Sequence, residues 1–402
     1  MADRDVLIVG GGPAGMMAGL LLARAGLAVR VIEKHGDFLR DFRGDTVHPS
    51  TLELFHELGL ADELLARPHD EVGTLSGRMG GRSFTVADFR HLPVRSPFIA
   101  LMPQWHFLDF LADVGRRYPG FDLAMNVEAT GIVEEEGRIT GIATAGGETL
   151  RARLVIACDG RHSVLRAAAG LAVEDLGAPM DVMWFRLPRE RTPDNRTAGI
   201  FDSGRIAVLI DRGDYWQCAW VIPKGSADRV RARGLDAFRA EIARTAPELA
   251  GKADALRGWD EVKLLTVTLD RLIRWHRPGL LAIGDAAHAM SPIGGVGINL
   301  AIQDAVAAAN ILAGPLAAGA DVDPLLARVQ ARRMFPTRII QAIQRAVQTR
   351  IIGPVLEEEG DGTALAPPLA LRLLDAVPLL QRIPARLVGL GVRPEHVRSP
   401  AA

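Results

Sequence analysis

The sequence has few cysteines and no leader-like start. Its 402 residues include two cysteines, Cys158 and Cys218, which are far apart and form no CxxC pair. A disulfide framework and a clustered zinc site are therefore excluded, and no metal is expected. The first residues enter a strand pattern without the basic segment, apolar run and cleavage site of a signal peptide, so we expect a reducing, cytoplasmic location.

The chain also lacks an excess of charge of one sign and a long hydrophobic run. It has 47 basic and 48 acidic residues, with a net charge of −1, so no nucleic-acid partner is expected. The most apolar stretch, residues 305–320, is shorter than the roughly 20 residues of a membrane-spanning helix and contains Gly314 and Pro315. No transmembrane segment is therefore expected.

The N-terminal segment has the pattern of a strand, a glycine turn, a helix and a second strand. Residues 6–9 and 29–32 are apolar runs, and apolar residues recur at helical spacing over residues 14–25. Residues 10–15, GGGPAG, match GxGxxG at the start of the helix, and Glu33 ends the second strand. Such a turn binds a dinucleotide pyrophosphate and such a carboxylate binds ribose hydroxyls, with a pure packing role as the alternative. The expected cofactor contacts are Gly10, Gly12, Pro13, Ala14, Gly15 and Glu33.

Two later segments follow the apolar runs 154–158 and 280–283, which we expect in the same parallel sheet. They are residues 158–166, CDGRHSVLR, and residues 284–299, GDAAHAMSPIGGVGIN. With the glycine turn, they resemble the three signatures of the group A flavoprotein monooxygenases, the aromatic hydroxylases that include p-hydroxybenzoate hydroxylase and the ubiquinone-biosynthesis hydroxylases. The resemblance covers about residues 3–350 and implies that the dinucleotide is FAD.

An α/β fold is expected from the strand pattern and the resemblance together. It consists of a Rossmann-like FAD-binding domain of the GR2 type, an inserted, mostly antiparallel β-sheet substrate domain and a C-terminal helical region. The expected boundaries are residues 1–71, 102–177 and 270–353 for the FAD-binding domain, 72–101 and 178–269 for the substrate domain, and 354–402 for a linker and C-terminal helices.

The third motif contains residues suited to a flavin. Asp285 follows a strand, and its carboxylate suits the ribityl chain, with a helix cap or a turn as the alternative. Gly295 and Gly297 permit a close approach of the backbone to a planar ring. A helix that begins near Ile298 and Asn299 directs its positive end at that ring, which stabilises the negative charge of reduced flavin.

The resemblance implies further cofactor contacts. It places Arg43 beside the FAD diphosphate, Gln104 beside FAD and the backbone of Val127 at the adenine. A surface salt bridge, a solvent-facing helix start and core packing are the respective alternatives. It also implies that Asp159 serves both FAD and the nicotinamide donor, and that Arg166 holds this turn by hydrogen bonds.

Hydroxylation of an aromatic ring is the implied reaction. FAD reduced by NAD(P)H reacts with dioxygen to give a C4a-hydroperoxide, which transfers oxygen to a phenol-like or quinone-precursor-like small molecule. The family places the carbonyl of Pro292 near that oxygen, and a conformational role is the alternative. Because no second GxGxxG follows a strand, NAD(P)H is expected to bind transiently as a co-substrate. The sequence sets neither the NADH or NADPH preference nor the oligomeric state.

Substrate contacts are marked only by a strand pattern. Alternation over residues 215–222 places Trp216 and Trp220 on one face, which we expect to line the ring pocket, with sheet core packing as the alternative.

The rival functions are a flavin-dependent reductase or dehydrogenase of an unsaturated lipid or small molecule, a halogenase and a non-enzymatic flavoprotein. Residues 369–390 are rich in Leu and Arg, so they either contact a membrane surface or pack on the FAD-binding domain.

Overall fold

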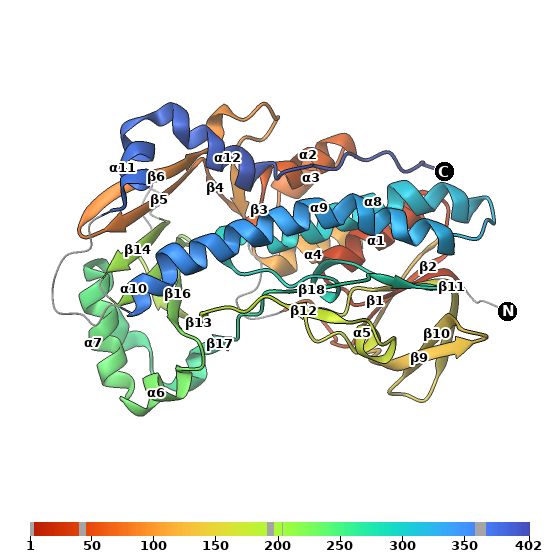
Figure 1. Cartoon of the computed structure of the whole chain (residues 1–402), viewed down its shortest axis with the longest axis horizontal. Coiled ribbons are helices and arrows are strands. Elements are labelled where there is room, and N and C mark those ends of the chain that lie inside the picture. Colours follow the sequence, from red (N-terminus) through yellow and green to blue (C-terminus); the bar gives the residue numbers. More distant parts are fainter. Residues whose placement is uncertain (1–3, 40–45, 191–196, 203, 358–366) are drawn as a thin grey trace.

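Two large β-sheets organise the chain, and helices pack against both of them (Figure 1). The structure is a computed structural model that describes residues 4–39, 46–190, 197–202, 204–357 and 367–402. The two sheets lie at opposite ends of the long axis of the molecule, and the long helices α8 and α9 extend between them.

The first sheet is mainly parallel and is assembled from remote segments. Its strand order is β19-β20-β11-β1-β2-β8, and β10 and β9 extend β11 as an antiparallel hairpin. The predicted runs 154–158 and 280–283 lie in this sheet as neighbours of each other, as expected. The strands are β1 (Arg4–Val9), β2 (Val29–Glu33), β8 (Phe121–Met125), β9 (Ala129–Glu135), β10 (Arg138–Thr144), β11 (Thr149–Ala157), β19 (His276–Arg277) and β20 (Leu280–Ala282).

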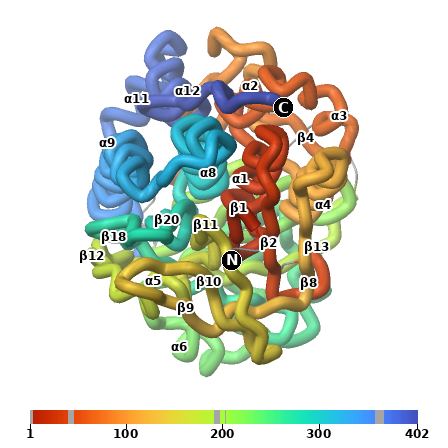
Figure 2. The backbone as a smooth tube through the Cα atoms, turned by 90° about the vertical axis from the view of Figure 1, so that its right-hand side faces the viewer, coloured from red at the N-terminus to blue at the C-terminus, as the bar shows by residue number. Residues whose placement is uncertain are grey.

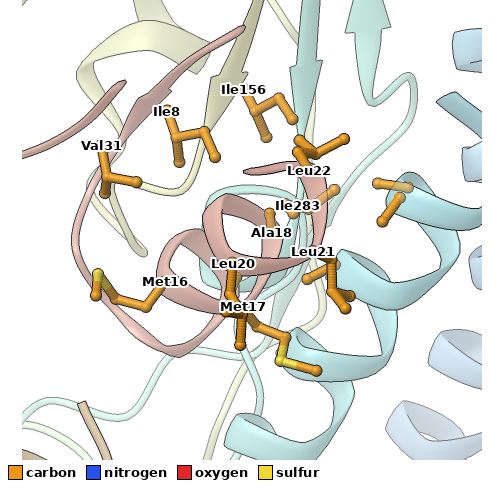
Figure 3. Close-up of a cluster of buried hydrophobic side chains, with 14 of the residues drawn as sticks. Ile8, Met16, Met17, Ala18, Leu20, Leu21, Leu22, Val31, Ile156 and Ile283 are labelled. Atoms are coloured by element: carbon orange, nitrogen blue, oxygen red, sulfur yellow. The ribbon is translucent and has the colours of Figure 1, made fainter. Parts of the chain in front are cut away.

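Helix α1 (Pro13–Arg24) fills the space between this sheet and α8 (Gly297–Ala317). Figure 3 shows Ile8, Val31 and Ile156 of the strands above α1, with Met17 and Leu21 directed away from the sheet. Gly19 lets α1 approach the sheet, because a Cβ there would lie 2.7 Å from the side chain of Val31. The buried apolar face of α1 therefore forms the core of this half of the molecule. Helices α4 (Gln104–Gly115) and α9 (Asp323–Val347) lie on either side of the α1 and α8 pair (Figure 2).

Helix α8 is longer than the apolar stretch in the sequence indicated. Pro315 lies in its last turn and does not end it, so the helix has 21 residues. Residues 293–317 are long and apolar enough to cross a membrane by length and composition, but 78% of the most apolar window is buried inside the protein. The helix packs against α1 and α9, so its apolar character reflects its place in the core.

The second sheet is antiparallel except for one parallel pair, β14 with β5. Its strand order is β17-β13-β16-β15-β14-β5-β6, which agrees with the mostly antiparallel sheet expected here. Helices α6 (Ala227–Ala232) and α7 (Leu235–Thr245) contribute to the core against one of its faces. The strands are β5 (Thr74–Met79), β6 (Arg82–Asp88), β13 (Met180–Pro188), β14 (Ala198–Asp202), β15 (Arg205–Asp211), β16 (Tyr215–Pro223) and β17 (Lys263–Leu265).

The C-terminal helices α11 (Leu369–Ala376) and α12 (Arg382–Gly389) pack on β6. They therefore contact the second sheet, and α12 also contacts the segments expected to form the FAD-binding domain, as the packing alternative named. The carbonyl of Val388 lies 2.8 Å from Nδ1 of His48, and Leu387 packs against the cluster that contains Leu300 of α8. Residues 390–402, here called the C-terminal segment, then pass over α8 towards α1, where the N–H of Ala402 donates to the carbonyl of Arg24 at 2.9 Å (Figure 2).

Short elements connect these parts. They are β3 (Thr46–Val47), α2 (Pro49–Glu57), α3 (Ala61–Leu65), β4 (Asp70–Val72), β7 (Ile99–Leu101), α5 (Val164–Ala168), β12 (Val173–Asp175), β18 (Asp270–Leu272) and α10 (Gly353–Glu357). Strand β7 pairs with both β3 and β4. This small sheet joins the start of α2 to the segment that leads into α4.

Candidate active site

The carboxyl ends of four parallel strands meet at one edge of the first sheet. The register pairs Val9 with Ile32, Val9 with Ala157, and Ala157 with Ala282. The segments that follow these strands therefore lie next to one another, and they carry the glycine turn, Glu33, Asp159 and Asp285. Such an edge is where open α/β sheets bind their ligands.

The three glycines of the turn at residues 10–15 meet different constraints. Gly10 has a φ of 108°, and a Cβ there would collide with the carbonyl oxygen of Cys158. A Cβ on Gly15 would collide with the carbonyl oxygen of Gly10. A Cβ on Gly12, in contrast, would meet nothing within 4 Å. The protein itself needs Gly10 and Gly15, whereas Gly12 faces open space.

This open space lies at the start of α1. Gly12 is the N-cap residue and Pro13 opens the helix, and no side chain caps it among the described residues. Ala14 is buried against the sheet, so the turn presents mainly backbone. Backbone N–H groups at a helix start, with the positive end of the helix dipole behind them, fit the pyrophosphate of FAD.

The residues expected near the ribose and adenine lie beside the glycine turn. Oε2 of Glu33 accepts the N–H of Gly11 at 3.0 Å, and the N–H of Val127 donates to the carbonyl of Glu33 at 2.9 Å. Gln104 is the first residue of α4 and is half-buried. Arg43 lies outside the described residues.

Two turns that follow β11 and β20 are linked by arginines. Arg166 donates to the carbonyl of Arg161 and, at 3.4 Å, to the carbonyl of Ala286, so it holds the turn as expected. Arg161 also lies 3.7 Å from the carboxylate of Asp285. Oδ2 of Asp159 accepts the N–H of Leu165 at 3.1 Å.

The other carboxylate oxygen of Asp159 is buried and has no partner among the described residues. A buried carboxylate oxygen without a donor is costly, so a ligand with hydroxyl groups fits this position. FAD has such groups on its ribityl chain and its ribose. The orphaned oxygen and the open space at Gly12 are two independent observations that fit FAD.

The glycine loop, residues 292–297, is held in one conformation. Gly294 and Gly295 have φ values of 76° and 62°, and a Cβ on Gly295 would collide with Oγ1 of Thr46. Oγ1 of Thr46 donates to the carbonyl of Gly295 at 2.8 Å. The carbonyl of Pro292 accepts the N–H of Gly295 at 3.0 Å, which gives Pro292 the conformational role that was the alternative.

The side chain of Asn299 holds this loop. It is 5% exposed, and its Oδ1 accepts hydrogen bonds from the N–H of His48 and Oγ1 of Thr51, both at 2.8 Å. Its Nδ2 donates to the carbonyls of Thr46 and Gly295, at 3.0 and 3.2 Å. All four hydrogen-bonding positions of the amide are occupied within the protein. An Asn299 contact with a flavin would therefore come from its backbone.

Helix α8 begins at the glycine loop. Gly297 is its first residue, and no side chain among the described residues caps it. The side chain of Ile298 is buried in the core, so the first turn offers backbone N–H groups. Those groups and the helix dipole suit the negative charge of a reduced flavin, as the sequence predicted.

A buried ionic cluster lies behind these turns, and it was not predicted from the sequence. Oδ2 of Asp304, in α8, accepts the N–H of Gly284 at 3.1 Å and lies 2.6 Å from Nε2 of His288. Nε of Arg333 donates to Oδ1 of Asp304 at 2.9 Å. Burial raises the pKa of Asp304, but His288 and Arg333 outweigh it and hold the pKa below its ordinary value. The sequence indicated this cluster only through Asp304, a charged residue among the apolar residues of α8.

Trp216 and Trp220 pack in the core of the second sheet, which was the alternative to a substrate role. Both are 4% exposed, and Trp220 lies edge-on to Phe238 of α7, with 5.8 Å between ring centroids. The alternation along β16 is as predicted, and the face that carries Trp216 and Trp220 packs against α7. The opposite face carries Ala219, which packs in the same cluster as Ile293 of the glycine loop.

Comparisons with known proteins agree with this architecture. A model of the FAD binding domain family matches residues 3–343. The 6-methylpretetramide 4-monooxygenase of Streptomyces rimosus is 33% identical over 405 residues, which cover 99% of this chain and 95% of the relative. The 3-demethoxyubiquinol 3-hydroxylase of Escherichia coli K12 is 27% identical, with 84% and 87% covered.

Solved structures have the same fold. The crystal structure of Pseudomonas aeruginosa PqsL in complex with 2-aminobenzoylacetate has a TM-score of 0.74 and 25% identity, and the match covers 88% of this chain and 97% of that one. The OxyS anhydrotetracycline hydroxylase from Streptomyces rimosus has a TM-score of 0.75 at 23% identity, over 98% of this chain and 77% of that one.

Proposed function

Because the chain belongs to the family defined by this FAD-binding domain, we propose that its FAD-dependent monooxygenase activity uses NAD(P)H and dioxygen to hydroxylate a small phenolic or quinone-precursor-like ring. The observation that carries the proposal is the convergence of the glycine turn, Glu33, Asp159 and Asp285 at the carboxyl edge of the first sheet. The names of two relatives, a 6-methylpretetramide 4-monooxygenase and a 3-demethoxyubiquinol 3-hydroxylase, support hydroxylation as the reaction.

The protein would hold FAD along this edge. Gly12 and the start of α1 would bind the diphosphate, and Glu33 with the backbone of Val127 would bind the ribose and adenine. Asp159 and Asp285 would accept hydrogen bonds from the hydroxyl groups of the cofactor. When bound and reduced, FAD supplies two electrons and activates dioxygen, so that one oxygen atom enters the ring and the other leaves as water.

The remaining task of the protein is to fix charge and exclude water. The first turn of α8 directs backbone N–H groups at negative charge, while Asn299 and Thr46 keep the glycine loop rigid, so that these groups need no reorganisation during the reaction. We place Arg43 and Gln104 beside FAD as well. We also propose that the carbonyl of Pro292 has a second role, beside the reacting oxygen.

We place the substrate between the glycine loop and the face of β16 opposite Trp216. Ala219 and Ile293 belong to the cluster on this side. Nearby, Nε of Arg212 donates to Oε1 of Gln217 at 3.1 Å, so this face also carries a buried, ordered polar pair. An apolar surface with a few fixed polar groups suits an aromatic substrate.

The other proposals concern organisation and location. We propose that residues 1–71, 102–177 and 270–353 form the FAD-binding domain, that residues 72–101 and 178–269 form the substrate domain, and that residues 354–402 add a linker and C-terminal helices. NAD(P)H would bind transiently, with Asp159 near its site, and the enzyme would work in the cytoplasm. The relatives do not favour a reductase or dehydrogenase of unsaturated compounds.

A spectrum and a substrate screen test the function. The purified protein should have the visible absorbance of a flavin, and phenols should be screened for faster oxidation of NADH and of NADPH. Fused-ring phenols come first, because the 33% identical relative is named for 6-methylpretetramide. The proposal predicts that an accelerating phenol is converted to a product heavier by one oxygen atom. Oxidation of NAD(P)H that no aromatic compound accelerates would contradict it.

A further inference from the structure

A chain of buried ionic side chains connects the C-terminal segment to the turn that carries Asp285. Nη1 of Arg333 donates to Oε1 of Glu395 at 3.2 Å, and Nε of Arg333 donates to Oδ1 of Asp304 at 2.9 Å. The exposed fractions of Glu395, Arg333 and Asp304 are 6%, 1% and 0%. Oδ2 of Asp304 then accepts the N–H of Gly284, the residue before Asp285. The path from the segment to the cofactor turn has no solvent-exposed member.

The C-terminal segment reaches this chain by crossing the helices that surround the site (Figure 2). Downstream of Glu395, the segment is tied to α2, where Oε2 of Glu57 accepts the N–H of Val397 at 2.7 Å. It is tied to α8, where Oδ1 of Asn310 accepts the N–H of Arg398 at 2.7 Å. These ties hold the segment in place but do not reach Arg333. The segment meets Arg333 through the carbonyl of Arg393, at 3.3 Å, and through Glu395, whose side chain brings the compensating charge.

The charges explain why Glu395 matters to the turn. A guanidinium as deeply buried as that of Arg333 must be compensated, because a buried charge without sufficient partners is strongly destabilising. Asp304 has one oxygen on Arg333 and uses the other for Gly284 and His288. Glu395 also accepts a hydrogen bond from Nε of Arg332 at 2.6 Å, and Arg333 also donates to the carbonyl of Arg393. If Glu395 loses its charge, Asp304 is the remaining carboxylate that contacts Arg333 among the described residues, and Arg333 pulls it towards itself. The N–H of Gly284 then loses its acceptor.

We propose that Glu395 is a positioning residue for the FAD site, acting through Arg333 and Asp304 on the turn of Gly284 and Asp285. Gly284 adopts its φ of 61° without strain, but its buried N–H relies on Asp304 as acceptor, so the position of Asp304 bears on this turn. The C-terminal segment accordingly helps to position the cofactor site, although it lies outside the matched FAD-binding domain at residues 3–343. The proposal rests on the FAD-binding part of the proposed function and not on the substrate.

The test compares, in the full-length chain, a variant of the C-terminal segment with a variant of α2 that loosens the same segment. Glu395→Gln removes the charge that faces Arg333, and Glu57→Gln weakens the tie to Val397 and His396 while leaving Glu395 in place. FAD is titrated into each apoprotein and followed by quenching of flavin fluorescence, and the visible spectrum of each holoprotein is recorded. We expect E395Q to raise the Kd for FAD about tenfold, as the loss of one charge-assisted contact implies, and E57Q to leave it unchanged.

The outcomes are distinct. An unchanged Kd and an unchanged flavin spectrum in E395Q would overturn the proposal and leave Glu395 with a purely structural role. An equal rise in Kd in E57Q would also overturn it, because the effect would then belong to any loosening of the segment. A wild-type chain that does not take up FAD would overturn the FAD site itself, and this proposal with it. If E395Q does not fold, E395D takes its place, with a weaker rise in Kd as the supporting result and an unchanged Kd as the contrary one.

Discussion

Oδ1 of Asn299 accepts the backbone N–H of His48 at 2.8 Å, so a side chain in the first turn of α8 holds the residue that precedes α2. The same amide donates to the carbonyls of Thr46 and Gly295. Two segments that are about 250 residues apart in sequence are therefore fixed against each other beside the expected flavin. The position needs both a donor and an acceptor, which an amide provides and a carboxylate does not.

Asn299→Asp tests this clamp. The carboxylate still accepts from His48, but it cannot donate to the carbonyls of Thr46 and Gly295, and it places a negative charge against them. We expect the free energy of unfolding to fall by about 2 kcal/mol, and FAD to bind roughly tenfold more weakly. Asn310→Asp, in the same helix, is the control, and it should leave FAD affinity unchanged. Equal FAD affinity in N299D and the wild type would refute the role of the clamp.

Substitutions at two glycines of the turn at residues 10–15 should affect different properties, folding in one case and FAD binding in the other. Gly12→Ala adds a Cβ that meets no protein atom, at a φ of −76° that alanine adopts readily, so the apoprotein should keep its Tm. That Cβ fills the space assigned to the FAD diphosphate, so FAD affinity should fall by about a hundredfold, or about 3 kcal/mol. Gly10→Ala collides with Cys158 and should yield little folded protein. Tight FAD binding by G12A would show that the cofactor does not pass this turn.

Asp285→Ala tests the carboxylate assigned to the ribityl chain. The side chain is 37% exposed, and the ion pair with Arg161 is long, at 3.7 Å, so its removal should change stability by less than about 0.5 kcal/mol. The variant should lose FAD on gel filtration, which the ratio of visible to ultraviolet absorbance measures. The matched control is Glu134→Ala, which removes a half-exposed carboxylate from a 2.7 Å ion pair with Arg277. Full FAD retention by D285A would contradict the assignment.

His48 should make the protein acid-sensitive. Burial lowers its pKa to about 4, against 6.5 in the unfolded chain, although its hydrogen bond to the carbonyl of Val388 raises the pKa. The unfolded state therefore takes up a proton first as the pH falls. The contribution of neutral His48 to the free energy of unfolding is complete above pH 6.5 and is lost as the pH falls from 6.5 to 4. By pH 5 the free energy of unfolding has fallen by about 2 kcal/mol.

Urea unfolding at pH 7 and pH 5 measures this loss. His48→Asn removes the titrating group, so the variant should lose less stability on acidification than the wild type does. The pKa values of His106 and His276 are also lowered by burial, and they contribute equally to both proteins. The difference between the proteins therefore isolates His48. Equal losses in the two proteins would show that His48 does not titrate in this way.

The cofactor edge could be predicted because each of its parts follows an apolar strand. The glycine turn, Asp159 and Asp285 stand directly after runs that have the composition of buried parallel strands. The carboxyl ends of such strands share one edge, so the sequence was sufficient to bring remote segments together. The antiparallel character of the second sheet was also predicted, from its short strands between turn residues.

The parts that the sequence did not predict depend on tertiary packing. Alternation divided β16 into two faces, but which face packs against α7 depends on the tertiary structure. The sequence therefore could not decide between core packing and substrate contact for Trp216 and Trp220. The partners of Asp304 lie in α9 and in the turn after β20, and no local pattern indicates which charged residues will meet. The same holds for Asn299, whose side chain serves the protein rather than the flavin.

The most direct measurement follows labelled dioxygen into the product. The holoenzyme is incubated under ¹⁸O₂ with NADH or NADPH and the phenol that most strongly accelerates oxidation, and the product is analysed by mass spectrometry. We predict a hydroxylated ring that carries one ¹⁸O atom, formed in step with oxidation of the nicotinamide. Complete conversion of the labelled dioxygen to hydrogen peroxide, with the aromatic compound recovered unchanged from every phenol tested, would contradict this prediction.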